Sequence, residues 1–144
     1  MSKILLIHGP NLNMLGIRER SIYGDLTLDE INAMIESKAA SLGLTVEIHQ
    51  SNHEGVIIDI IHSAYGRLDG IIINPGAYTH YSYAIADAIA SVSLPTIEVH
   101  LSDINKREEF RRHSVIKAVA LEQISGLGAR SYLIAMEKMA QILK

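Results

Sequence analysis

Residues 70–76 have the sequence Gly-Ile-Ile-Ile-Asn-Pro-Gly, from which the class of fold can be inferred. Three consecutive isoleucines follow a glycine and stop at Asn-Pro-Gly, so the apolar run is short and shows no alternation with polar residues. Such a run is typical of a strand in a parallel sheet, which is buried on both faces. It predicts a strand over residues 70–74 in a sheet that helices cover on both sides.

Outward from this strand, short apolar segments alternate with amphipathic ones. Further strands are predicted over residues 3–8, 44–50 and 96–100 and within residues 115–124. Helices are predicted over residues 28–43, 55–65, 82–91 and 129–143, with a short helix or turn in 102–112. Strands that alternate with helices imply a parallel sheet with crossover connections. We expect an α/β fold, a flavodoxin-like three-layer sandwich with a five-stranded parallel sheet of order 2-1-3-4-5 and helices on both faces.

The first predicted helix carries its own start and stop signals. Thr27 and Glu30 are spaced as a capping box, in which each residue binds the backbone amide of the other. Ile31 and Ile35 then recur at helical spacing, and Gly43 is placed to end the helix.

The composition limits the class of protein. A chain of 144 residues, 48% hydrophobic and 20% charged, predicts a single globular domain over residues 1–144. The absence of cysteine excludes a disulfide scaffold and cysteine-ligated metal. The net charge of −3, without a dense basic stretch, argues against nucleic acid and anionic membranes as partners. No apolar segment resembles a membrane span or a signal peptide, so we expect a cytoplasmic protein.

Ligands of such folds bind beyond the carboxyl ends of the strands. The segments at that edge are residues 9–27, 51–55, 75–81 and 101–112. The first greatly exceeds the roughly 4–6 residues of a usual connection and contains Arg18 and Tyr23. Two interpretations are open, an active-site lid over about residues 17–25 or a solvated surface loop.

Four blocks at these strand ends resemble a known family. The first is Gly-Pro-Asn-Leu-Asn-Met-Leu-Gly at residues 9–16, followed by Arg18-Glu19 and Tyr23-Gly24. The others are Gln-Ser-Asn-His-Glu-Gly at 50–55, Asn-Pro-Gly-Ala-Tyr-Thr-His at 74–80, and Glu-Val-His-Leu-Ser at 98–102 with Arg-Glu-Glu-Phe-Arg at 107–111. In their order and spacing, over nearly the whole chain, these blocks resemble the type II 3-dehydroquinate dehydratases.

The resemblance implies a hydro-lyase of the shikimate pathway, which serves aromatic amino-acid biosynthesis. Members convert 3-dehydroquinate to 3-dehydroshikimate by a trans-dehydration through an enolate, with no cofactor, no metal and no Schiff base. The resemblance also implies a homo-oligomer in which trimers assemble into a dodecamer. The reaction requires a base for the C2 proton, a stabiliser for the enolate and an acid for the departing C1 hydroxyl.

The resemblance assigns catalytic roles to five residues. Tyr23 matches the base, and a guanidinium at Arg18 would favour the ionised phenol. His100 matches the general acid, and Glu98, two residues earlier on the same strand face, is expected to orient it. Asn11 matches the residue that positions a water against the enolate oxygen.

Six further positions match groups that bind the substrate. They are Asn74, His80, Asp87, Leu101, Ser102 and Arg111. Leu101 and Ser102 match backbone amides and a hydroxyl that hold the substrate carboxylate. Asp87 matches an aspartate that reaches the site of a neighbouring subunit, although by itself it has the character of an ordinary solvated helix residue.

Some positions depart from the family pattern. Arg20 stands where proline is usual in the lid. The other departures are Ala86, Asp103, Asn105, Lys106, Lys117, Ala118, Glu122 and Ser131. None coincides with a matched catalytic residue, so they concern subunit packing, lid movement and affinity more than the reaction.

Three alternatives remain at this stage. A flavodoxin-like module for FMN or a phosphoryl group needs a Ser/Thr/Gly-rich loop or an acidic cluster, and the strand ends His8-Gly9 and Asn74-Pro75 provide neither. A lyase for a related cyclic hydroxy-acid would use the same scaffold. A catalytically silent subunit is disfavoured by the intact set Arg18, Tyr23 and His100. The histidines form no His-Glu-x-x-His motif, which argues against a functional metal.

Overall fold

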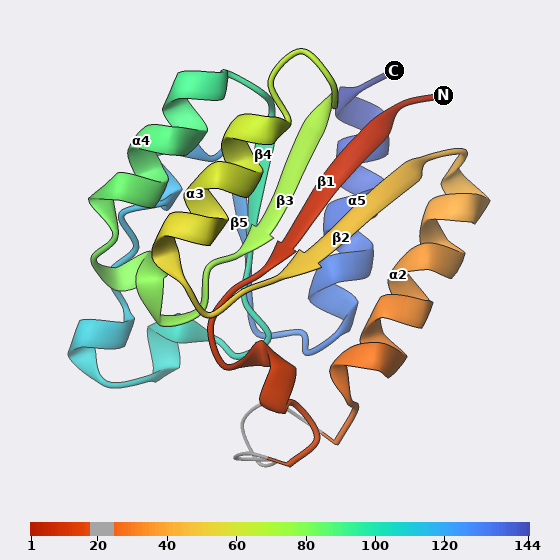
Figure 1. Ribbon diagram of the computed structural model, residues 1–144. Coiled ribbons are helices and arrows are strands. Elements are labelled where there is room, and N and C mark those ends of the chain that lie inside the picture. The colour runs from red at the N-terminus through yellow and green to blue at the C-terminus, as the bar shows by residue number, and fades with distance from the viewer. Residues whose placement is uncertain (18–24) are drawn as a thin grey trace.

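A computed structural model describes residues 1–17 and 25–144 (Figure 1). At its centre is a parallel sheet of five strands: β1 (Lys3–His8), β2 (Thr45–Gln50), β3 (Gly70–Asn74), β4 (Thr96–Val99) and β5 (Glu122–Ile124). The strands lie in the order β2-β1-β3-β4-β5, and every neighbouring pair is parallel. The predicted fold and strand order are confirmed.

Helices cover both faces of this sheet, as Figure 1 shows. One face packs against α2 (Leu28–Leu42) and α5 (Arg130–Ile142), and the other against α3 (Glu54–Ser63) and α4 (Tyr83–Val92). Within residues 1–17 and 25–144, no helix is long and apolar enough to cross a membrane.

The start of α2 is built as the sequence predicts. The Thr27 hydroxyl accepts a hydrogen bond from the Glu30 backbone amide at 3.2 Å, and the Glu30 carboxylate accepts one from the Thr27 amide at 3.4 Å. Gly43 ends the helix with a φ of 70°, a left-handed conformation that glycine adopts without strain.

The alternation of side chains along the strands divides the core into two apolar layers. Ile4 and Leu6 of β1 face α2 and α5, whereas Leu5 and Ile7 face α3 and α4. All five residues of β3 are buried, which confirms that this strand is covered on both faces.

The same alternation places polar side chains on opposite faces at the carboxyl edge. His8 and Asn74 are Cα partners at the ends of β1 and β3. Each comes two residues after a side chain that faces α2 and α5, so both lie on that face of the sheet. Glu98 pairs with Ile73 and therefore lies on the face of α3 and α4. The sheet thus brings a separate polar cluster to each side of one edge.

Candidate active site

A small polar pocket of about 140 Å³ opens at the carboxyl edge of the sheet. It lies where the loops after β1, β3 and β4 meet. Seven of the predicted residues line it: Asn11, Asn74, His80, His100, Leu101, Ser102 and Arg111. Loops that are distant in sequence converge here because parallel strands all end at this edge.

Two of these loops touch through Gly9. Its backbone amide donates a hydrogen bond to the Asn74 carbonyl at 2.7 Å. A Cβ atom at Gly9 would lie 2.7 Å from the backbone of Pro75, so only glycine permits this approach. The contact fixes the Asn11 loop beside the end of β3.

His100 and Glu98 form a buried pair at the end of β4. His100 Nε2 lies 2.5 Å from Glu98 Oε2, and the two residues are 5% and 0% exposed. Because a carboxylate can only accept, Nε2 carries the proton, and Nδ1 is the ring nitrogen that Glu98 does not engage. The contact joins the two residues whose pairing the sequence predicts, and the orienting role of Glu98 stays a prediction.

Two hydroxyl groups complete the surroundings of Glu98. Thr79 Oγ1 donates at 2.5 Å, and Ser114 Oγ lies 2.8 and 3.0 Å from the two carboxylate oxygens. Burial alone would raise the pKa of Glu98, but the hydrogen bonds from His100, Thr79 and Ser114 lower it below its ordinary value. The result is a fixed negative charge behind the His100 ring.

His80 contributes a second, differently held imidazole. Its Nδ1 donates to the His113 carbonyl at 2.7 Å, which leaves Nε2 as the acceptor of the neutral ring. Burial, assisted by the neighbouring His100 and Arg111, lowers the pKa of His80 below its ordinary value, although the His113 carbonyl opposes this shift. His80 is therefore neutral near neutral pH.

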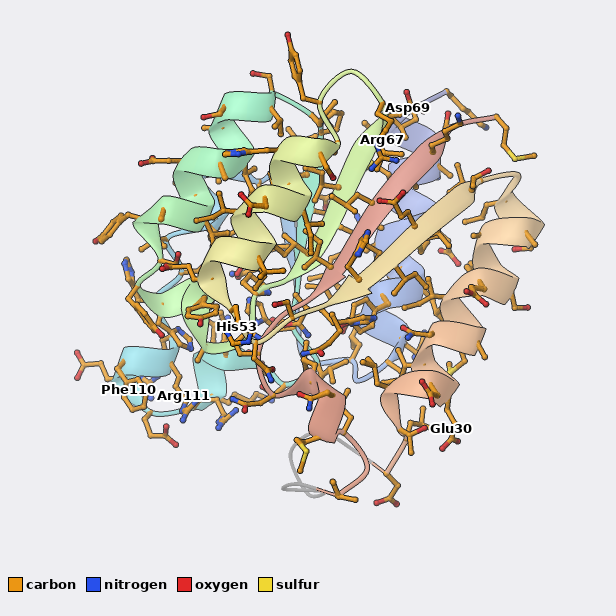
Figure 2. The ribbon with its side chains drawn as sticks, viewed as in Figure 1. Glu30, His53, Arg67, Asp69, Phe110 and Arg111 are labelled. Atoms are coloured by element: carbon orange, nitrogen blue, oxygen red, sulfur yellow. The ribbon has the colours of Figure 1, made fainter. Side chains whose placement is uncertain are left out.

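Cationic side chains line the outer wall of the pocket. Arg111 Nε donates to Glu108 Oε2 at 2.5 Å, and its guanidinium lies 4.9 Å from the centre of the Phe110 ring. Figure 2 shows Phe110 and Arg111 together at the end of the molecule opposite Arg67. Arg107 Nη1 donates to Ser102 Oγ at 3.3 Å. Two guanidiniums and a hydroxyl suit an anionic ligand with further hydroxyls.

Asn11 lies at the pocket in a left-handed conformation, with a φ of 70°. Its backbone amide donates to Asn52 Oδ1 at 3.0 Å, and Gln50 Nε2 donates to the Gly9 carbonyl at 3.2 Å. These contacts tie the Asn11 loop to the end of β2 and the loop that follows it. They hold the backbone that carries the Asn11 side chain in place.

The other predicted residues fall into two groups. Asp87 is exposed on α4 and does not line the pocket. Arg18 and Tyr23, with most of the predicted lid, lie outside the described residues. Among the described residues, no three His, Cys, Asp or Glu side chains are grouped to hold a metal ion.

Sequence reasoning gave no role to several residues that build the site. Arg107 lies within a matched block, four residues before Arg111, and its place in that block was the available signal. Thr79 and Ser114 lie far apart in sequence and meet only at Glu98. No pattern along the sequence predicts that both hydroxyls contact Glu98, because the contact arises from the packing of two loops.

Comparisons with known proteins agree with this arrangement. The family described as "Dehydroquinase class II" matches residues 2–140. A protein named 3-dehydroquinate dehydratase from Caldicellulosiruptor bescii is 58% identical over 144 residues, with 99% of each chain covered. The crystal structure of type II dehydroquinase from Butyrivibrio crossotus has a TM-score of 0.94 at 54% identity, with 97% of each chain covered. That of type II dehydroquinase from Propionibacterium acnes has a TM-score of 0.94 at 42% identity, covering 98% of this chain and 97% of the other. The chain belongs to the class II dehydroquinase family.

Proposed function

We propose that this protein is a type II 3-dehydroquinate dehydratase, a hydro-lyase that converts 3-dehydroquinate to 3-dehydroshikimate in the shikimate pathway. The observation that carries the proposal is the buried His100–Glu98 pair, 2.5 Å apart, in a pocket whose wall holds Arg107 and Arg111. In a chain of this family, that arrangement joins a proton donor to a binding surface for a hydroxylated anion.

The first step is removal of the C2 proton, which lies next to the C3 ketone. Tyr23 is the proposed base, and the guanidinium of Arg18 is proposed to stabilise its phenolate. The C–H electron pair then moves into the C2–C3 bond, and negative charge develops on the ketone oxygen. Asn11 is proposed to hold a water against that oxygen. Its position in the lining of the pocket supports this role.

The second step is departure of the C1 hydroxyl as water. His100 is the proposed acid, and it donates its proton from Nδ1 because Nε2 is engaged by Glu98. The carboxylate of Glu98 accepts the proton on Nε2 and fixes the plane of the ring. The electrons of the enolate return to form the C1–C2 double bond, so the product is a conjugated enone.

Substrate binding is proposed to use the remaining pocket residues. Leu101 and Ser102 present backbone amides and a hydroxyl to the carboxylate, near the guanidinium of Arg111. The neutral His80 offers Nε2 to a ring hydroxyl, and Asn74 offers an amide N–H. These groups together fix the ring relative to His100.

We also propose that the chain functions as a single cytoplasmic domain with a lid over about residues 17–25, assembled as trimers within a dodecamer. The position of Asp87 supports shared sites, because it is exposed on α4 and outside the pocket of its own chain. A neighbouring subunit would bring such a residue to a second pocket.

The direct test adds 3-dehydroquinate to the purified protein in the presence of a chelator and follows the absorbance of the conjugated enone. We expect turnover with chelator, and unchanged turnover after borohydride treatment with substrate. His100→Ala serves as the control and should form enone at least about 100-fold more slowly. A wild-type protein that forms no enone would overturn the proposal.

A further inference from the structure

A series of three hydrogen bonds, two of them buried and one part-buried, runs from the pocket through the α2/α5 face of the sheet. Asn74 Nδ2 lies 3.1 Å from the Tyr132 hydroxyl, which lies 2.8 Å from His8 Nδ1. His8 Nε2 lies 2.7 Å from Asn32 Oδ1. His8 and Tyr132 are 0% exposed, and Asn74 is 3% exposed. The four residues come from β3, α5, β1 and α2, so no single element holds the chain.

The Gly76 backbone amide fixes which atom donates and which accepts in each hydrogen bond of this series. The Gly76 backbone amide can only donate, and it donates to Asn74 Oδ1 at 3.1 Å. Asn74 must therefore turn its NH₂ group toward Tyr132, whose oxygen accepts. The Tyr132 O–H then donates to His8 Nδ1, and the proton of the His8 ring lies on Nε2, facing Asn32 Oδ1. Along this series every donated proton meets an acceptor, and one N–H of the Asn74 amide is left over for a further partner.

Burial keeps the two titratable members neutral. It lowers the pKa of His8 to about 4, although the hydrogen bond with Asn32 opposes the shift. It also raises the pKa of Tyr132 above its ordinary value, although the bond from Asn74 opposes this. The rings of His8 and Tyr132 pack edge to face, with centroids 5.0 Å apart, which limits their rotation.

We propose that Tyr132 and His8 are positioning residues that hold the Asn74 amide for substrate binding. An amide NH₂ group has two donors, and Tyr132 accepts from one of them. The second donor is thereby held in a fixed direction on a residue that lines the pocket. It is suited to a hydroxyl or carboxylate oxygen of the substrate. The kinetic part of this inference rests on the proposed function; the geometric part does not.

Tyr132→Phe tests the proposal because it removes only the hydroxyl. We expect KM for 3-dehydroquinate to rise about tenfold with kcat within about twofold, since the lost interaction serves binding more than the chemical step. In the Asn74→Ala background the same change should have no further effect on KM, because Tyr132 acts through Asn74. Ser131→Ala is the matched control, since it removes another buried α5 hydroxyl, one that binds the Leu127 amide instead.

A second pair of variants separates positioning from folding. The side chain introduced by His8→Gln can accept from Tyr132 and donate to Asn32, whereas the one introduced by His8→Leu can do neither. We expect His8→Gln to keep KM within about threefold of wild type, and His8→Leu to raise it about as much as Tyr132→Phe. An unchanged KM in both Tyr132→Phe and His8→Leu would overturn the proposal, as would independent effects of Tyr132→Phe and Asn74→Ala.

A readout without turnover makes the two hypotheses separable. The side-chain amide resonances of Asn74 in the ¹⁵N-labelled protein should shift in Tyr132→Phe and stay in place in Ser131→Ala. If the wild type forms no enone, the proposed function fails, and these resonances still decide whether Tyr132 holds Asn74. Resonances of Asn74 that do not move in Tyr132→Phe would contradict the positioning role.

Discussion

His8 and Glu98 show how surroundings decide the charge of a buried side chain. Both are 0% exposed at the carboxyl edge of the sheet. Among the described residues, the side chain of His8 is hydrogen-bonded to Asn32 and Tyr132, which are both neutral, so burial dominates and lowers its pKa to about 4. Glu98 is hydrogen-bonded to His100 and two hydroxyls, so its pKa falls despite burial. One face of the sheet thus holds a neutral imidazole, and the other holds a carboxylate.

The neutral state of His8 predicts a pH dependence of stability. Above pH 6.5 the side chain is neutral in both the folded and unfolded protein, so its full contribution is present. As the pH falls from 6.5 toward 4, the unfolded chain binds the proton and the folded protein does not, so stability is lost. The loss amounts to about 3 kcal/mol by pH 4.

Urea unfolding at pH 7.5 and 4.5 measures this effect against His8→Gln, which has no titrating group at that position. The free energy of unfolding of the wild type should fall by roughly 2–3 kcal/mol more than that of the variant. Parallel pH profiles of the two proteins would show that His8 does not titrate differently on folding.

Ser114→Ala tests the support of Glu98. Loss of this donor should raise the pKa of Glu98, so the acid-side limb of the kcat profile should move to higher pH. The maximal kcat should fall about tenfold, because the His100 ring is held less firmly. Ser41→Ala, which removes a hydroxyl bonded to the Lys38 carbonyl on α2, is the control. A Ser114→Ala profile that superimposes on wild type contradicts the support role.

At the scale of elements, patterns that act locally were sufficient for prediction. The isoleucine run over 71–73 predicted the central strand, and Thr27 with Glu30 predicted the start of α2. The strand predicted within 115–124 is confirmed, and β5 occupies the last three residues of that range. Val115 and Ile116 instead pack against the α3/α4 face of the core. Two consecutive apolar residues have the same sequence pattern whether they belong to a strand or pack against a helix.

The parts of the site that were predictable are those that directly follow strands. His100 and Asn74 end or follow strands of a parallel sheet, so the strand order alone brings them to one edge. The partners Tyr132 and Ser114 were not predictable, because each meets the site through the packing of a distant element. Tertiary contacts of this kind leave no periodic signal in the sequence.

The capping box of α2 predicts a measurable stability. Thr27→Ala removes the acceptor for the Glu30 amide and should lower the free energy of unfolding by about 1 kcal/mol. Thr27→Ser keeps the acceptor and should stay within about 0.5 kcal/mol of the wild type. Urea midpoints of the three proteins provide the comparison, and an Ala variant as stable as the Ser variant would contradict the role of the cap.

At the scale of the whole molecule, the sheet separates two polar clusters. Each contacts a residue that lines the pocket, His100 on one face and Asn74 on the other. Glu98, Thr79 and Ser114 lie on the α3/α4 face, and His8 with Tyr132 lies on the α2/α5 face. In the proposed function the first cluster supports proton donation and the second supports binding. Variants on one face should therefore change kcat, and variants on the other should change KM.

The proposed sharing of sites between subunits predicts complementation. Asp87→Ala and His100→Ala are each expected to be poorly active, because the first lacks the residue proposed to reach a neighbouring site and the second lacks the proposed acid. In mixed oligomers some pockets combine His100 of one chain with Asp87 of another. We expect co-expressed variants to recover at least about tenfold more activity than either alone. Mixed oligomers, verified by mass spectrometry, without recovery would place Asp87 outside the shared site.

Deuterium exchange at C2 of 3-dehydroquinate tests whether enolate formation and water loss use different groups of the protein. NMR in D₂O follows the exchange for the wild type, His100→Ala and Tyr23→Phe. We expect His100→Ala to exchange the C2 proton while dehydration is lost, because its base remains. Tyr23→Phe should lose both reactions and stay folded. Exchange that persists in Tyr23→Phe, or that vanishes in a folded His100→Ala, would contradict the assignment of base and acid.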